Sequence, residues 1–425
     1  AFAPWSIPLR RPFSSYSHDV RRDLKLRRAV VSANNCPAAA FRRLTNCVAP
    51  ANSGKENAKN CRAVGSAWRY KRGEGLNPRP PLNQFMKTRI SFARLIVAAT
   101  AMVATCAYAT ESLTPAQVQE LRKNALQFTS AIPDKMPGAE KDTAAQVALG
   151  KRLYFDTILS KNQSQSCNTC HRVDDGLPGA DGEATSPGAF GKRGDRNSPT
   201  TLNAGFHHAQ FWDGRAATLE EQAKGPVLNP VEMAMPDEAE VLKRLRDHQE
   251  YPGLFKAAFG AENPPVSYDN MAKAIAAFER TLITRDRFDD FLKGDDRALS
   301  AAELRGLQTF TANGCTACHN GPLLGANSFQ KAGLIHPFPT KDPGRRAVTE
   351  DEFDEAKFKV PTLRNIALTG PYFHDGSIRS LDDAVKMLGW HQLGKELSTE
   401  EIREIGVFLH TLSGKDRRPI TAASG

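Results

Sequence analysis

Two short stretches of this 425-residue chain carry the same chemical pattern, Ser166–His171 (SCNTCH) and Gly314–His319 (GCTACH). Each contains C-x-x-C-H, in which two thiols three positions apart lie about one helical turn apart. Such thiols can form thioethers to one porphyrin, and the following histidine can then ligate its iron. The pattern predicts two covalent c-type haems. Their residues are Cys167, Cys170 and His171 for the first haem, and Cys315, Cys318 and His319 for the second.

A C-x-x-C pair has two other common uses, as half of a zinc site or as a disulfide. Two features of the chain favour haem over both. The motif occurs twice, and every cysteine after residue 109 belongs to one of its two copies. Zinc and disulfide remain the alternatives for each pair taken alone.

The first hundred residues do not resemble a folded domain. Residues 1–85 contain 16 Lys/Arg against 4 Asp/Glu, with proline clusters and no apolar period. Residues 86–109 instead read as a secretory signal peptide, with a basic start, an apolar run and an Ala107-Tyr108-Ala109 cleavage site. We interpret 1–85 as a non-native upstream segment, the alternative being a disordered basic arm. An uncleaved membrane anchor is the alternative for 86–109.

The positive net charge of the chain comes from these first segments. The whole chain has a formal net charge of +10, but the residues after 109 contain 38 Lys/Arg against 43 Asp/Glu. The basic balance of the chain therefore gives no reason to expect a nucleic-acid partner. Export fits the haem prediction, because c-type haem is attached outside the cytoplasm. We expect a periplasmic protein.

An amphipathic helix is predicted just before each haem motif. Residues 144–155 (AAQVALGKRLYF) precede the first motif and residues 301–310 (AAELRGLQTF) precede the second, with Gly150 and Gly306 at the same place. This similarity is an internal repeat. It predicts that the two motifs are positioned by equivalent elements.

Each half also ends with a predicted helix, 271–283 in the first and 398–412 in the second, where Ser398 and Glu401 form a capping box. Loops rich in proline and glycine fill much of the rest. We therefore predict an all-α, loop-rich fold with two cytochrome c-like haem domains in tandem. The predicted limits are 110–293 for the N-terminal domain, 298–414 for the C-terminal domain and 415–425 for a tail, with the charged residues 293–298 as linker.

Several further strings, in order, resemble those of the bacterial di-haem cytochrome c peroxidases. The resemblance extends over residues 144–414. It implies that the N-terminal haem binds peroxide and that the C-terminal haem accepts electrons from a small soluble donor, a monohaem cytochrome c or a cupredoxin. The implied reaction is reduction of hydrogen peroxide to water. The strings are RNSPTTLN (196–203), QFWDG (210–214), EEQAKGP (220–226), NPVEM (229–233), FKVPTLRN (358–365), TGPYFHDG (369–376) and AVKM (384–387).

The resemblance implies roles for individual residues of the peroxide site. Trp212 matches the tryptophan between the two haems, and Glu232 matches the active-site glutamate. Gln222 and Pro226 match residues of the pocket wall. Apart from the resemblance, Glu232 is followed by apolar residues, which suggests a carboxyl in a dry pocket with a raised pKa. The bland alternatives are a core aromatic side chain for Trp212 and a solvated surface carboxylate for Glu232.

Metal ligands are implied in the same way. Met387 matches the distal ligand of the electron-accepting haem, where a thioether raises the reduction potential, and the alternative is a methionine that fills the core. A calcium ion is implied at Asn197 and at the backbone carbonyls of Thr369 and Pro371, a set of oxygen donors that suits this cation. For Asn197 the alternative is an ordinary turn residue.

The sequence departs from the family in the loop after the first haem motif. Many members have a histidine there that caps the peroxide-binding iron, whereas residues 186–192 (SPGAFGK) contain none. We therefore expect the first haem to be open at rest, with ligation by His207 or His208 as the rival. The alternative functions are an oxidase like the enzyme that matures methylamine dehydrogenase, which Met387 opposes, and a non-catalytic electron carrier. A homodimer is left open.

Overall fold

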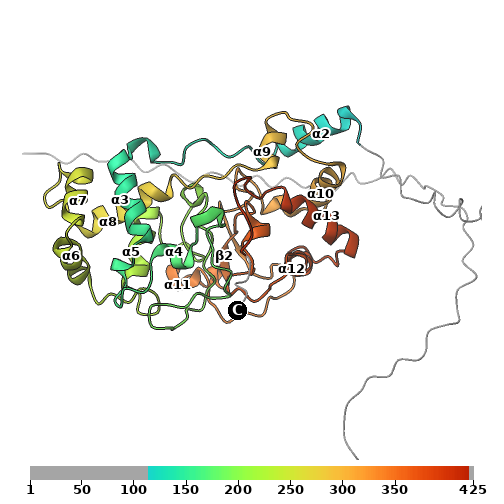
Figure 1. Cartoon of the computed structure of the whole chain (residues 1–425). Coiled ribbons are helices and arrows are strands. Elements are labelled where there is room, and N and C mark those ends of the chain that lie inside the picture. The colour runs from blue at the N-terminus through green and yellow to red at the C-terminus, as the bar shows by residue number, and fades with distance from the viewer. Residues whose placement is uncertain (1–112, 421–425) are drawn as a thin grey trace, which may run out of the picture. The chain divides into compact units, whose positions relative to one another are not determined.

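The computed structural model describes residues 113–420, so the predicted upstream segment and signal peptide lie outside the described residues. Helices dominate this part of the chain (Figure 1), as the all-α prediction required. No helix among residues 113–420 is both long and apolar enough to cross a bilayer. The α-helices are α2 (Pro115–Ala125), α3 (Ala144–Phe155), α4 (Cys167–Cys170), α5 (Leu219–Leu228), α6 (Glu238–Asp247), α7 (Tyr251–Phe259), α8 (Tyr268–Glu279), α9 (Arg287–Leu292), α10 (Ala301–Ala312), α11 (Arg346–Thr349), α12 (Leu381–Leu393) and α13 (Thr399–His410).

The strands of the described part form one short antiparallel pair. Strand β1 (Phe329–Lys331) pairs with β2 (Lys357–Lys359), and Phe329 lies opposite Lys359. The pair joins two loops of the second half, and its main consequence is that it fixes the position of Lys359, whose side chain is buried.

Capping residues set where the predicted helices begin. The capping box Ser398/Glu401 is present at α13, as predicted, and Thr143/Gln146 and Ser300/Glu303 do the same for α3 and α10. The helix predicted at 271–283 was placed slightly wrong. It spans Tyr268–Glu279 rather than 271–283, because Ser267 caps its start and the chain leaves the helix at Arg280.

The two glycines of the sequence repeat lie at two equivalent helix crossings. A Cβ on Gly150 of α3 would lie 1.8 Å from the backbone oxygen of Ala274 in α8. On Gly306 of α10 it would lie 2.2 Å from the backbone oxygen of Glu404 in α13. In both halves the helix before the haem motif therefore packs directly on the backbone of the closing helix.

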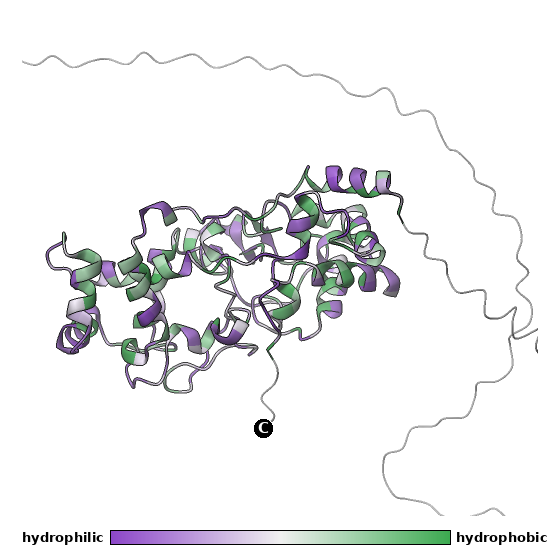
Figure 2. Ribbon diagram, turned by 45° about the horizontal axis from the view of Figure 1, so that its top comes forward, coloured by the Kyte–Doolittle hydropathy of each residue, from purple (hydrophilic) through white to green (hydrophobic). Residues whose placement is uncertain are grey.

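Buried apolar side chains form two large clusters that follow the two halves of the sequence. The first contains residues between Leu149 and Leu282. The second contains residues between Phe288 and Leu412, together with Val118, Leu121 and Ala125 of α2. Figure 1 accordingly shows α2 beside α9, far from α3, which follows it in sequence. Figure 2 shows that most helices carry both hydrophobic and hydrophilic residues, as expected when one face packs on such a cluster.

These clusters differ from the predicted domain limits at two places. Helix α2 belongs to the second cluster although it comes first in the chain, and α9 belongs there although it precedes the predicted linker. The division of the chain into two haem domains remains a prediction.

Candidate haem sites

The first C-x-x-C-H forms one turn of helix. Cys167 and Cys170 are the first and last residues of α4, so they stand at the two ends of this turn, and neither forms a disulfide. His171 follows as the cap residue, and its Nδ1 lies 2.9 Å from the backbone oxygen of Pro199. A carbonyl can only accept, so Nδ1 carries the proton and Nε2 is left with a lone pair. This is the tautomer that binds iron.

The second motif has the same arrangement with a different backbone partner. Cys315 opens the short 3₁₀ helix Cys315–Ala317, Cys318 follows it, and both thiols are free. His319 Nδ1 lies 3.0 Å from the backbone oxygen of Leu324. Burial lowers the pKa of both motif histidines, which favours the neutral, ligating form.

A cavity of about 250 Å³ opens beside the second motif. Cys315, Cys318 and His319 line it together with mostly apolar side chains from the surrounding loops and from α12. An apolar cavity with two free thiols and an imidazole lone pair on one wall fits a covalently bound porphyrin. Within residues 113–420 no three His, Cys, Asp or Glu side chains are grouped so as to hold a metal ion, so neither C-x-x-C pair has the other ligands of a zinc site.

Glu232 is half-buried, and its predicted role at the first motif remains a prediction. Its Oε1 accepts a hydrogen bond from Asn229 Nδ2 at 2.7 Å, and burial raises the pKa of its carboxyl group. Burial also raises the pKa of the Cys170 thiol to about 11, and the negative charges of Asp181 and Glu232 add to this effect. The charge of the Glu232 carboxylate thus reaches the Cys170 thiol of the first motif.

Helix α5 supports the turn that carries Glu232. The backbone N–H groups of Asn229 and Met233 donate to the carbonyl of Pro226 near the end of this helix. Gln222, a half-buried residue, lies one turn earlier on the same face. The structure thus brings Pro226 to the Glu232 turn, and Gln222 lies on the helix that supports it.

The loop without histidine packs directly on the same turn. The backbone N–H of Ala189 donates to the carbonyl of Glu232 at 2.8 Å. A Cβ on Gly188 would lie 2.0 Å from the carbonyl oxygen of Val231 and 2.8 Å from that of Glu232. No side chain larger than hydrogen fits at residue 188 in this conformation.

Trp212 and the predicted calcium residues meet at the cavity of the second motif. Trp212, Asn197, Thr369 and Pro371 all line it. The indole Nε1–H of Trp212 donates to the backbone carbonyl of Asn197 at 2.9 Å. Asn197 lies only two residues before Pro199, the partner of His171.

The two histidines that rival the open first site lie elsewhere. His207 lines the cavity of the second motif, where its Nδ1 is 3.0 Å from Lys359 Nζ. His208 is exposed and packs edge-on against Phe329. Burial lowers the pKa of Lys359 to about 7. Both histidines thus contact residues of the second half of the chain, and no local pattern indicated the pairing of His207 with Lys359.

Met387, the predicted distal ligand of the second haem, does not line the cavity of the second motif. The side chains of α12 that line the cavity include Val385 and Leu388, but not Met387, which is half-buried on another face of the helix.

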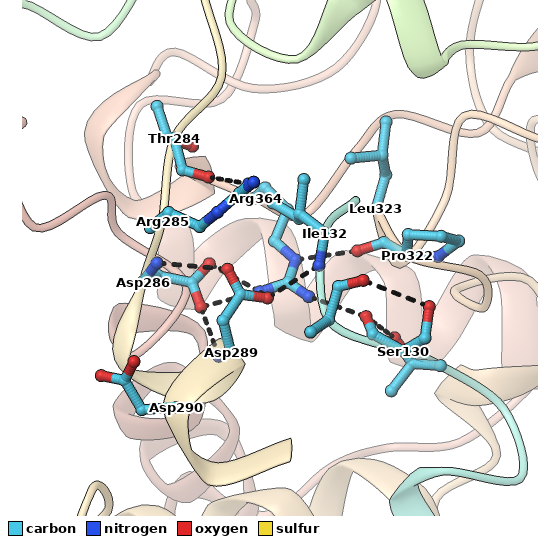
Figure 3. Close-up of polar contacts among 12 residues, drawn as sticks. Ser130, Ile132, Thr284, Arg285, Asp286, Asp289, Asp290, Pro322, Leu323 and Arg364 are labelled. Atoms are coloured by element: carbon cyan, nitrogen blue, oxygen red, sulfur yellow. Dashed lines mark hydrogen bonds and ion pairs between the residues drawn. The ribbon is translucent and has the colours of Figure 1, made fainter. Parts of the chain in front are cut away.

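A buried ion cluster behind the second motif was also missed. Arg364 is completely buried, and its Nη1 donates to both carboxylate oxygens of Asp286 at 2.7 and 2.6 Å (Figure 3). The same nitrogen lies 3.1 Å from Asp289, and Nε donates to the carbonyl of Pro322 at 3.0 Å. Pro322 belongs to the loop that supplies the carbonyl partner of His319. Arg364 stood in the string FKVPTLRN, but only the tertiary structure identifies its partners.

The comparisons with known proteins agree with this geometry. A family model described as di-haem cytochrome c peroxidase matches residues 144–297. Cytochrome c551 peroxidase of Pseudomonas aeruginosa is 46% identical to this chain over 320 residues, which are 73% of this chain and 92% of the relative. Methylamine utilization protein MauG of Methylophilus methylotrophus is 36% identical over 301 residues, which are 66% of this chain and 87% of that protein.

Among solved structures, a MauG-like protein associated with microbial copper homeostasis is similar in fold. The TM-score is 0.59 and the sequence identity 28%, and the match covers 67% of this chain and 94% of the other.

Proposed function

Because this chain belongs to the di-haem cytochrome c peroxidase family, we propose that it reduces hydrogen peroxide to water with electrons from a small protein donor. The family implies two c-type haems, which supply the redox chemistry when bound. One observation carries the proposal. The half-buried carboxyl group of Glu232 has a raised pKa, and its charge acts on the Cys170 thiol of the first C-x-x-C-H.

Glu232 would manage the protons of the reaction. Two electrons and two protons convert one hydrogen peroxide into two water molecules. The carboxylate takes the proton from one peroxide oxygen and returns it to the other, which becomes the first water. Asn229 holds the carboxyl in place through its 2.7 Å hydrogen bond. Gln222 and Pro226 form the wall on the α5 side.

Electrons would enter at the second motif and pass by way of Trp212. The support is a short series of contacts. Trp212 lines the cavity that also contains Cys318 and His319, and its indole bonds the carbonyl of Asn197. Two residues further on, Pro199 accepts the hydrogen bond of His171 in the first motif. The indole is thus linked to the first motif through few covalent and hydrogen bonds, and it lines the cavity of the second motif.

We propose that the first site is open to peroxide at rest. The loop 186–192 contains no histidine, and at Gly188 the packing on the Glu232 turn leaves no room for a side chain. His207 contacts Lys359 and His208 packs against Phe329, and both partners belong to the second half of the chain. No ligand therefore has to leave before peroxide binds.

Calcium at Asn197, Thr369 and Pro371 is a further proposal. All three line one cavity, and oxygen atoms of this kind are suitable ligands. The side-chain nitrogen of Asn197 donates to the carbonyls of Glu183 and Ala184, which leaves its side-chain oxygen directed elsewhere.

The sequence supports our proposals on the cellular setting and the partners of the protein. We propose export to the periplasm through residues 86–109, two cytochrome c-like haem domains in tandem, and a monohaem cytochrome c or a cupredoxin as donor. A homodimer is left open. An oxidase acting on a protein or organic substrate is the alternative enzyme, and the position of Met387 removes one argument against it. The higher identity to the peroxidases favours peroxide reduction.

The experiment that tests the proposal mixes the fully oxidised holoprotein with stoichiometric hydrogen peroxide in a stopped-flow spectrometer, without added reductant. We expect a fast change in the Soret band, followed by turnover when reduced cytochrome c is added. No change until one electron per molecule has been supplied would contradict the open first site. No turnover with any small donor would favour the oxidase, and no reaction at all would leave an electron carrier.

A further inference from the structure

Helix α12 forms one wall of the cavity beside the second haem motif. It begins after Ser380, whose side chain accepts from the backbone N–H of Asp383, and it ends at Gly394. The side chains that it contributes to the cavity are those of Leu381, Ala384, Val385, Leu388, His391, Gln392 and Leu393, with Gly389 among them. The question is which of them stands where a distal ligand of the second haem would be.

The spacing of these residues defines a single face. Consecutive residues of an α-helix are separated by about 100° around the axis, so residues 381, 385, 388 and 392 lie along one line. Met387 lies about 100° away from Leu388. It is half-buried, but it is not among the residues that line the cavity.

The rotation of α12 about its axis is fixed by close contacts. A Cβ on Gly389 would lie 2.7 Å from Leu397 Cγ and 3.2 Å from the backbone oxygen of Lys395. A turn of the helix that moved Met387 to the place of Leu388 would move Leu388 to the place of Gly389, where no side chain fits. The same turn would place the exposed carboxylate of Asp383 where Ala384 is now, at 4% exposure.

Hydrogen bonds at the end of the helix hold the same orientation. Gln392 Nε2 donates to the backbone carbonyl of Lys331, and Gln392 Oε1 accepts from the backbone N–H of Leu334. His391 Nδ1 donates to the carbonyl of His336 at 2.9 Å. These three hydrogen bonds join α12 to the end of β1 and to the loop that follows it.

We propose that Leu388, and not Met387, faces the distal side of the second haem, so that this haem has no thioether ligand. The proposal takes the presence of the second haem from the proposed function, and it rests on that function in this respect. Its consequence is electronic. A methionine opposite histidine raises the reduction potential of haem iron. An isobutyl group cannot coordinate, so the second haem has a lower potential than a histidine–methionine haem in the same cavity.

The test compares wild type with Leu388→Met and Met387→Leu in the holoprotein, without peroxide. The two readouts are the near-infrared charge-transfer band of a ferric haem with a thioether ligand and the midpoint potential of the second haem from spectroelectrochemistry. We expect no thioether band in wild type and no change in Met387→Leu. Leu388→Met should gain the band and raise the potential, because it places sulfur in the cavity.

Three outcomes would overturn the proposal. One is a thioether band in wild type. Another is a lower midpoint potential of the second haem in Met387→Leu. The third is a Leu388→Met variant that folds but lacks the thioether band. If Leu388→Met does not fold, the wild-type spectrum and the midpoint potential of Met387→Leu still show whether the second haem has a thioether ligand. Haem content is measured separately, so a protein with two haems that fails to reduce peroxide contradicts the proposed function and leaves this inference standing.

Discussion

The carboxyl group of Glu232 is the residue on which the proposed proton transfer depends. We expect Glu232→Gln to slow the peroxide-dependent absorption change by about 10²–10⁴-fold, because an amide cannot accept the proton. The carboxylate is the active form and burial raises its pKa, so the wild-type rate should fall on acidification at a higher pH than an ordinary glutamate would give. Stopped-flow rates across a pH series check both points.

The matched control for this prediction is Glu262→Gln, an exposed glutamate far from both motifs in sequence. It should leave the rate and its pH dependence unchanged. An acidic limb that persists in Glu232→Gln would assign the proton transfer to another group.

A second carboxyl group, that of Glu279, should influence stability rather than rate. It is buried at the end of α8, its Oε2 has no hydrogen-bond partner among the described residues, and burial raises its pKa to about 8. A pKa raised on folding means that the folded protein holds this proton more tightly. Its contribution to stability is therefore complete below the unfolded pKa of 4.5 and is lost as pH rises to about 8.

The measurement is the free energy of unfolding of the holoprotein between pH 5 and 9. In this window Glu279 should contribute a decline of at most about 1.4 kcal/mol per pH unit, because one pKa unit corresponds to that energy. Glu279→Gln should remove this contribution, since glutamine does not titrate. An identical pH dependence in wild type and Glu279→Gln would show that the carboxyl is ionised in the folded protein.

At the scale of elements, the crossing of α3 and α8 depends on Gly150. We expect Gly150→Ala to destabilise the protein by about 1–3 kcal/mol or more, the usual cost of overpacking, because the new Cβ would meet the backbone of Ala274. Gly253 in α7 is the matched control, since nothing lies within 4 Å of its added Cβ. Gly253→Ala should stabilise by about 0.5–1 kcal/mol. Denaturant unfolding of both variants measures the difference, and a stable Gly150→Ala would mean that the helices can separate.

The sequence predicted those elements that local signals define. The repeat around Gly150 and Gly306 predicted two equivalent helices, and the structure gives the reason, a close crossing in each half. The packing of α2 on the second core was not predictable, because no pattern within residues 115–125 indicates which distant segment they contact. Tertiary contacts of this kind carry no local signature.

The same distinction applies to the candidate site. The C-x-x-C-H motifs are local, so their histidines were identified from spacing alone. Met387 was identified by its string, but one residue along a helix changes the direction of a side chain by about 100°. That direction is fixed by tertiary contacts, the packing at Gly389 and the hydrogen bonds of Gln392. The partners of Arg364 and Lys359 depend on segments separated by long stretches of sequence, so neither contact could be read in advance.

For the folded part of the chain as a whole, the cluster around Arg364 joins segments from both halves. Arg364 Nη2 donates to the carbonyl of Ser130, and the backbone N–H of Ile132 donates to Asp289. We expect Arg364→Met to cost about 3–5 kcal/mol, because it leaves two buried carboxylates without their counterion. The measurement is denaturant unfolding of the holoprotein.

Arg403→Met is the control for this prediction. Arg403 forms an exposed ion pair with Glu400 on α13, and such pairs contribute little to stability, so we expect almost no change. Equal effects of Arg364→Met and Arg403→Met would mean that the buried cluster adds nothing beyond an ordinary surface pair.

The packing of α2 on the second core has a consequence for biogenesis. The polypeptide is synthesised from its N-terminus, so α2 is made before the helices on which it packs, which lie more than 150 residues later. Contacts between such distant segments slow folding, because a long loop must close before they form. The second core therefore stays incomplete until nearly all of the chain has been made. We therefore expect Cys315 and Cys318 to react with haem before the second core is complete, so that the last step of folding encloses a bound cofactor.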